Sequence, residues 1–139
     1  MNHQQIVDNV ARRAELPTRR SAEHALRAVL ETLAERISPS SALALAEKLP
    51  VESGVYLQDV PPARPSEKNL ESFLDRIAGR LALTRPDATR VSRAVISVIG
   101  DAAGEEAIRR PREELPFEWR VIFESRRYPI PVPVPSPRA

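Results

Sequence analysis

The sequence predicts an all-α protein in which two pseudo-repeated three-helix units pack as one helical bundle, followed by an extended proline-rich C-terminal tail. Three observations predict this fold. Hydrophobic residues recur at spacings of three and four positions, which places them on one face of a helix. The pattern of the first half returns in the second half. Only three Phe, two Tyr and one Trp occur among the 139 residues, so the core must be mainly aliphatic, which suits helix-on-helix packing.

The repeat organises the whole chain. Residues 6–11 match residues 73–78 at a spacing of 67, and residues 28–30 match residues 94–96 at a spacing of 66. Leu49-Pro50 and Leu115-Pro116 keep the spacing of 66, so a single-residue shift in the first turn aligns residues 6–123. The alignment divides the chain into a first helical unit (1–57), a proline-rich linker (58–66), a second helical unit (67–124) and a proline-rich tail (125–139).

Each unit is predicted to contain the same succession of helices. The first helix carries a narrow apolar stripe and the second a wider apolar face, both at helical spacing. The third helix is short, and a brief helical turn follows it. The expected helices cover about 3–15, 19–37 and 39–49 in the first unit and about 67–82, 86–102 and 105–115 in the second, with turns at about 51–57 and 117–124.

Capping residues and prolines set the expected ends of these helices. Thr18 and Ser38 are expected N-caps in the first unit, because their side-chain oxygens can accept a hydrogen bond from the first turn. Ser66 is expected to cap the first helix of the second unit in the same way. Pro39 and Pro86 fit a first helical turn, where a missing N–H removes no helical hydrogen bond.

Pro50 and Pro116 mark the ends of the third helices, and Pro111 lies inside one of them. Each third helix is expected to end at its Leu-Pro pair, because the residue before a proline avoids the helical region. Pro111 instead stands inside the third helix of the second unit, at the position of Leu45 in the first. An interior proline costs a regular helix about 3 kcal/mol. We therefore expect this helix to be kinked, split or restarted at Pro111.

The linker and the tail are both rich in proline. Pro61, Pro62 and Pro65 predict a stiff, extended linker. Prolines stand at every second position from Pro129 to Pro137, and this spacing forbids a helix. Two interpretations of the tail stay open: an extended, mostly disordered end, or a polyproline-type ligand or strap that lies across the helices. A strap would make its contacts through Tyr128, Ile130, Val132 and Val134.

Composition excludes several classes of function. The chain has no cysteine, which excludes disulfides, thiolate catalysis and cysteine-ligated zinc. No apolar run approaches the roughly 20 residues that span a bilayer, and residues 1–5 do not resemble a signal peptide, so we expect a cytoplasmic protein. His3 and His24 lack metal-ligand spacing and are expected on the surface. No catalytic constellation or phosphate-binding glycine loop occurs, so we expect no enzyme, cofactor or metal.

The arginines are the candidate nucleic-acid site. All but two of the 21 cationic residues are arginines, although the 19 acidic residues leave a net charge of only +2. The bias toward arginine also fits a plain effect of genome base composition. Acidic residues share the same helices, and no aromatic residues alternate with the arginines for base stacking, so nucleic-acid binding is the less favoured interpretation. The possible phosphate contacts flank the first inter-helix turn: Arg12, Arg13, Arg19 and Arg20.

The repeated residues resemble a known family. The matching segments are Ala28-Val29-Leu30, Leu33, residues 49–52, Phe73-Leu74, Ala94-Val95-Ile96 and Leu115-Pro116. They resemble the bacterial domain-of-unknown-function 2267 (DUF2267) family, over about residues 4–124. The resemblance implies an all-helical tandem unit in the bacterial cytoplasm. It implies no activity, because the family has no established catalytic residues. The second unit departs from the pattern at Pro111 and at Gly104-Glu105, where the first unit has Ser-Pro.

A narrower resemblance concerns the first two helices. Residues 6–11 and 21–30 resemble the helical half of HU-type histone-like proteins. That family holds DNA with β-arms, and no such arm follows residue 37, so the resemblance implies a helical hairpin and not DNA binding.

The leading functional hypothesis is therefore a non-enzymatic protein-interaction or scaffold module that binds a protein partner or a second copy of itself. The alternatives are a DNA-associated protein that uses the four arginines named above, and a helical small-ligand binder. Trp119 is expected either to anchor the core or to form an exposed hot spot for a partner.

Overall fold

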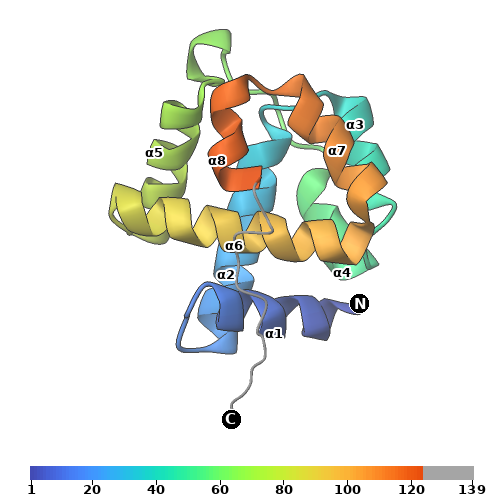
Figure 1. Ribbon diagram of the computed structural model, residues 1–139, viewed down its shortest axis with the longest axis vertical. Coiled ribbons are helices and arrows are strands. Elements are labelled where there is room, and N and C mark those ends of the chain that lie inside the picture. The colour runs from blue at the N-terminus through green and yellow to red at the C-terminus, as the bar shows by residue number, and fades with distance from the viewer. Residues whose placement is uncertain (124–139) are drawn as a thin grey trace.

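The computed structural model describes residues 1–123, and Figure 1 shows them as helices joined by turns and by one longer linker. No strand occurs in this part of the chain, so the predicted all-α bundle is confirmed. The tail residues Tyr128, Ile130, Val132 and Val134 lie outside the described residues. The elements are α1 (His3–Arg13), α2 (Arg19–Ala34), α3 (Pro39–Ala46), α4 (Val51–Gly54), η1 (Val55–Leu57), η2 (Pro65–Glu67), α5 (Leu70–Leu81), α6 (Arg85–Ala103), α7 (Glu105–Glu114), η3 (Phe117–Trp119) and α8 (Arg120–Phe123).

The order of elements repeats the order predicted from the sequence. Helices α1, α2 and α3 are followed by α4 and η1, just as α5, α6 and α7 are followed by η3 and α8. The backbone repeats as well. Glu15 and Ala82 follow the first helix of each unit with φ of 56° and 55°. The next residues, Leu16 and Leu83, each donate a 2.9 Å backbone hydrogen bond to the carbonyl five residues earlier.

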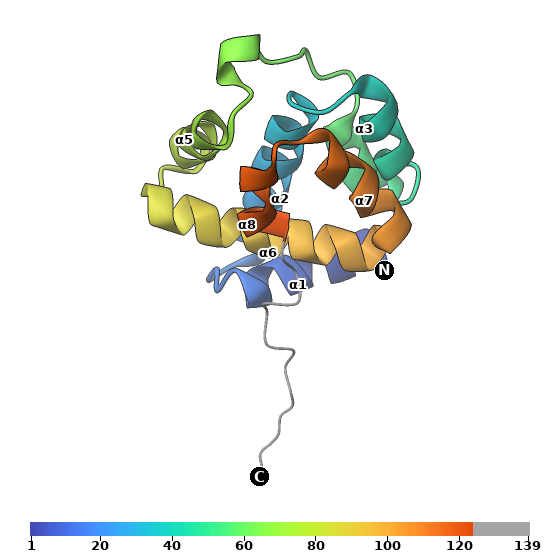
Figure 2. The same ribbon diagram turned by 45° about the horizontal axis from the view of Figure 1, so that its top comes forward.

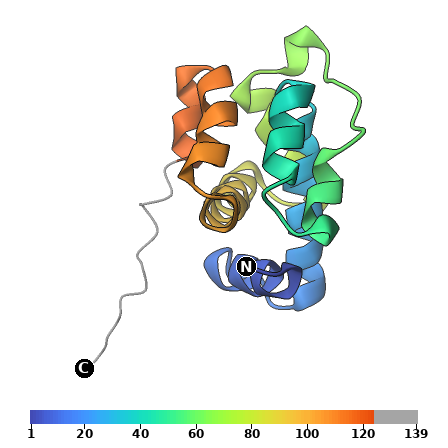
Figure 3. The same ribbon diagram turned by 90° about the vertical axis from the view of Figure 1, so that its right-hand side faces the viewer.

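Helices α2 and α6 form the centre of the bundle. Helix α1 packs against both of them, and α5 does the same, so the two units interlock. Figure 3 views α6 nearly end-on, between α1 and α7. The core is mainly aliphatic, as predicted. The largest fully buried aliphatic side chains of the core include Ile6, Leu26, Leu30, Leu33, Leu45, Ile77, Ile99 and Ile122. None of the helices within residues 1–123 is long and apolar enough to cross a membrane.

Trp119 belongs to this core. Its side chain is 1 % exposed, and its ring centroid lies 4.8 Å from that of Phe73. A partner therefore cannot reach it, and the structure corrects the suggestion of an exposed hot spot at Trp119 in favour of a core anchor. The accessible aromatic in this segment is Phe117, which is 79 % exposed.

Helices α3 and α7 lie side by side at one edge of the bundle (Figure 2). Glu114 at the end of α7 accepts hydrogen bonds from the backbone N–H and the hydroxyl of Ser38, both at 2.8 Å, and from the hydroxyl of Ser41. Burial would raise the pKa of Glu114, but these donors hold it below the ordinary value of 4.5. The N-terminus of α3 is thus fixed by a carboxylate from the other unit.

One expectation about a helix end was wrong, and the expected split or restart at Pro111 does not occur. Helix α5 begins at Leu70, and its N-cap is Asn69 and not Ser66, because Ser66 lies within the short η2 turn. Helix α7 is neither split nor restarted at Pro111, and it runs on to Glu114. The Pro111 ring is buried, so its packing against the interior offsets part of the missing hydrogen bond.

The linker is tied to the first unit. Ala63 donates a 2.9 Å backbone hydrogen bond to the carbonyl of Glu35, which follows the last residue of α2. Val60 is partly buried against the core. These contacts bring the linker across the end of α2 before α5 begins.

Candidate functional site

A groove of about 730 Å³ runs along the solvent-facing side of α2. We call it the α2 groove. Helix α1 contributes Gln4 and Val7 to its walls, η1 contributes Tyr56, and α5 contributes Arg80. The charged residues that line it are Arg19, Arg20, Arg27 and Arg80, with Glu23 and Glu31.

The groove follows from the amphipathic pattern of α2. Leu26, Leu30 and Leu33 point into the core and are fully buried. The charged residues recur at the same helical spacing on the opposite side, so they form one polar stripe. Thr18 begins the helix with the predicted cap, since its side chain accepts a hydrogen bond from the backbone N–H of Ser21.

The four arginines of the α2 groove differ in how far they are already neutralised. Arg19 lies 3.0 Å from Asp8, and Arg27 lies 3.0 Å from Glu31. The Arg27 guanidinium also lies 5.8 Å from the centre of the Tyr56 ring. Arg20 is exposed and makes no hydrogen bond or ion pair within residues 1–123, so its charge is available to a ligand.

One wall of the groove is held by a chain of polar side chains. The two ring nitrogens of His3 lie 2.7 Å from the Ser53 hydroxyl and 3.0 Å from the Glu23 carboxylate. The Tyr56 hydroxyl donates a 2.6 Å hydrogen bond to Glu23. Burial would raise the pKa of Glu23, but the hydrogen bonds from Tyr56 and His3 hold it below 4.5. Burial and the bond to Glu23 raise the pKa of Tyr56 to about 12.

The second unit has no counterpart of this polar chain. At the positions equivalent to His3, Ser53 and Tyr56, it has Leu70, Trp119 and Ile122, and Trp119 and Ile122 are buried in the core. A polar chain in one unit thus replaces apolar packing in the other. At these positions, one wall of the α2 groove therefore has polar contacts that the second unit does not repeat.

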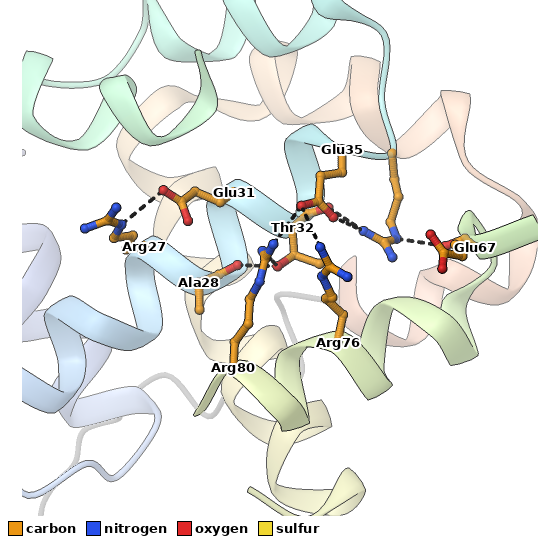
Figure 4. A network of polar contacts seen from close by, with 9 residues as sticks. Arg27, Ala28, Glu31, Thr32, Glu35, Glu67, Arg76 and Arg80 are labelled. Atoms are coloured by element: carbon orange, nitrogen blue, oxygen red, sulfur yellow. Dashed lines mark hydrogen bonds and ion pairs between the residues drawn. The ribbon is translucent and has the colours of Figure 1, made fainter. Parts of the chain in front are cut away.

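The inner end of the groove adjoins a cluster of arginines around one carboxylate, shown in Figure 4. The Glu35 carboxylate lies 2.7 Å from Arg36, 2.8 Å from Arg80 and 3.7 Å from Arg76. Glu35 is only 8 % exposed. Three guanidinium groups therefore face one carboxylate, and the cluster keeps a surplus of positive charge next to the groove.

The cluster is also the polar joint between α2 and α5. Arg80 from α5 donates to the hydroxyl of Thr32 in α2, which Figure 4 shows beside Glu35. Arg36 donates to the backbone carbonyls of Thr32 and Glu67 at 3.0 and 3.1 Å. Burial lowers the pKa of Arg36, as do the like charges of its neighbours, while Glu35 opposes this effect.

The structure separates the four arginines that the sequence singled out as phosphate contacts. Arg19 and Arg20 line the α2 groove, and Arg12 and Arg13 do not. Arg13 lies 2.6 Å from Asp101 and donates to Ser97, so it joins α1 to α6. Arg12 is exposed and bonds to Asn9 on its own helix.

Sequence reasoning placed both histidines on the surface, and this is correct only for His24, which is exposed in the groove. His3 is partly buried because Ser53 and Glu23 satisfy both of its ring nitrogens. Serine, histidine and glutamate in a row resemble a nucleophilic triad, but Ser53 is 0 % exposed, so no substrate can reach its hydroxyl. Within residues 1–123, no group of three or more potential ligands gathers to hold a metal ion.

A comparison with known families gives a match over nearly all of the described residues. The family described as "Uncharacterized conserved protein (DUF2267)" matches residues 3–122, which include both units and every residue of the α2 groove. A comparison with curated proteins gave no match.

Proposed function

The chain belongs to the DUF2267 family of uncharacterised conserved proteins, and we propose that it is a non-enzymatic protein-interaction module whose α2 groove binds an acidic segment of a partner protein. The observation that carries this proposal is the surplus of guanidinium groups along the groove. Arg20 is exposed and unpaired within residues 1–123, and Arg80 reaches the groove from a cluster of three arginines around Glu35. Guanidinium groups bind carboxylates with paired hydrogen bonds. As the family resemblance implies, we place this module in the bacterial cytoplasm.

The mixed charge of the groove favours a protein over a nucleic acid as the partner. Glu23 and Glu31 lie among the arginines, and both would repel the evenly spaced phosphates of a nucleic-acid backbone. A protein segment presents carboxylates together with N–H donors, so it can satisfy both kinds of charge. The separation of Arg12 and Arg13 from the groove also leaves fewer cations in one place for phosphate contacts.

Two observations of residues 1–123 support a non-enzymatic role: the Ser53 hydroxyl is buried, and the exposed His24 of the groove has no hydrogen-bond partner. The buried Ser53 hydroxyl and its partner His3 serve to hold Glu23 and Tyr56 in place. His24, the exposed histidine of the groove, makes no hydrogen bond within residues 1–123 that would orient it for proton transfer.

Fluorescence anisotropy with two labelled probes tests the proposal: a glutamate-rich peptide and a random-sequence DNA duplex. We expect the peptide to bind at low salt and the complex to weaken as salt increases. Arg20→Ala should weaken peptide binding about fivefold, because each exposed ion pair is worth up to about 1 kcal/mol. Arg20→Glu should weaken binding further, since it introduces repulsion.

Arg12→Ala is the matched control, because Arg12 is also exposed but lies outside the groove. It should leave the peptide affinity within twofold, since long-range charge effects are small. Duplex binding that is tighter than peptide binding and falls equally in Arg12→Ala and Arg20→Ala would contradict the proposal and favour a DNA-associated protein.

A further inference from the structure

The positive charge of the α2 groove is concentrated at its two ends. Arg20 stands in the first turn of α2 and makes no ion pair within the described chain. At the other end, Arg80 is held near the last turn of α2 by Thr32 and Glu35. A guanidinium has five N–H donors, and the two bonds of Arg80 leave further donors for a ligand.

The middle of the groove, in contrast, is internally neutralised. Arg27 pairs with Glu31 at 3.0 Å and lies over the Tyr56 ring. Glu23 is bonded to His3 and Tyr56. An anionic group placed here would meet two carboxylates whose charges are held in position, so the middle attracts it less than either end.

The helix fixes the distance between the two ends. Arg20 and Thr32, the partner of Arg80, are twelve residues apart on α2. At a rise of about 1.5 Å per residue, this separation is about 18 Å along the helix axis. An extended chain in the polyproline II conformation advances about 3.1 Å per residue and turns once in about three residues, so side chains about six residues apart lie on the same side and about 19 Å from each other.

We infer that the α2 groove recognises two acidic side chains that stand about six residues apart, on the same side of an extended segment of the partner. The inference rests on the proposed function and names the pattern that the partner must carry. One acidic side chain pairs with Arg20 and the other with Arg80, while the intervening residues cross the neutral middle next to Tyr56.

Peptides of identical composition test this spacing. Each is a proline-rich chain, extended as polyproline II, with two glutamates placed three, six or nine positions apart, so that both glutamates lie on the same side in every peptide. The wild-type protein should bind the six-residue spacing about fivefold more tightly than either of the others, because only this spacing forms both ion pairs. Arg20→Ala should lower the affinity for the six-residue peptide to that of the other two.

Arg80→Ala should abolish the preference for spacing as well, and circular dichroism shows whether this variant is folded. If Arg80→Ala is not folded, the result from Arg20→Ala alone tests the inference. Arg20→Ala should fold, because Arg20 is exposed and has no structural contact to lose within residues 1–123. Arg12→Ala should retain the preference. Binding that is equally tight at all spacings would overturn the inference and leave the proposed function in place. Failure of every acidic peptide to bind would overturn both.

Discussion

Replacing Glu35 by glutamine keeps the shape of the side chain and removes the charge that Arg36 and Arg80 share. Both partners lie within 2.8 Å of the carboxylate, and Arg36 is only 6 % exposed. In the Glu35→Gln variant, three guanidinium groups would stay close together without a counter-charge. The variant should therefore be strongly destabilised, even though no hydrophobic contact is lost.

The expected loss of unfolding free energy is about 3 kcal/mol. Removing one partner of a buried ion pair costs about 3–5 kcal/mol. The lower end applies because Arg76 and Arg80 are partly exposed and can turn toward water. For a chain of this length, 1 kcal/mol corresponds to about 3–4 °C, so the Tm should fall by about 10 °C.

Urea unfolding followed by circular dichroism measures this loss, with Glu31→Gln as the matched control. Glu31 lies one turn earlier on the same helix and pairs with the largely exposed Arg27. Its replacement should cost less than about 0.5 kcal/mol, as for other exposed helical pairs. Equal losses in the two variants, or a loss below about 1 kcal/mol for Glu35→Gln, would refute the reasoning about buried charge.

Three further predictions concern stability. Ala82→Gly should raise the unfolding free energy by about 1 kcal/mol in urea unfolding, since Ala82 has φ of 55°, where only glycine is unstrained; no gain would contradict this. Gly54→Ala should lower the unfolding free energy by about 2 kcal/mol, because the new Cβ would lie 2.8 Å from the carbonyl oxygen of Ala46. Gly79→Ala is the control: its new Cβ would meet nothing within 4 Å and should not destabilise the protein. Because the pKa of Glu114 is lowered, the stability that its carboxylate contributes is complete above pH 4.5 and is lost as the pH falls through the lowered pKa. The urea midpoint of Glu114→Gln should therefore fall less in acid than the midpoint of the wild type. Parallel pH profiles for the two proteins would contradict this.

Much of the fold was predictable because it rests on local patterns. Thr18 and Ser38 cap α2 and α3 as expected, and Pro39 and Pro86 lie in the first turns of α3 and α6. The repeat predicts the equivalent helices of the two units without any knowledge of tertiary contacts. These features depend on neighbouring residues, which a sequence displays directly.

The errors arose where a tertiary or competing contact decided the outcome. Ser66 and Asn69 can both cap a helix, and the η2 turn that occupies Ser66 leaves the role to Asn69. Pro111 reads as a helix breaker, but it is buried, and the helix continues through it.

The candidate site was predictable only in part. Arg19 and Arg20 were identified from their position at the inter-helix turn, but Arg80 joins them from a helix far along the chain. His3 was missed because a lone histidine carries no spacing signal. A usable signal did exist in the repeat, since His3 and Tyr56 are polar where the second unit has Leu70 and Ile122.

The central claim is that the α2 groove is the binding surface, and mapping by NMR tests it most directly. The protein would be titrated with the acidic peptide whose glutamates stand six positions apart, and the shifts of backbone amides and arginine side chains would be followed. The claim predicts that the largest shifts occur at Arg20, Arg27 and Arg80, with little change at Arg109, which is on α7 outside the groove. Shifts centred on α7, or binding without shifts along α2, would contradict it.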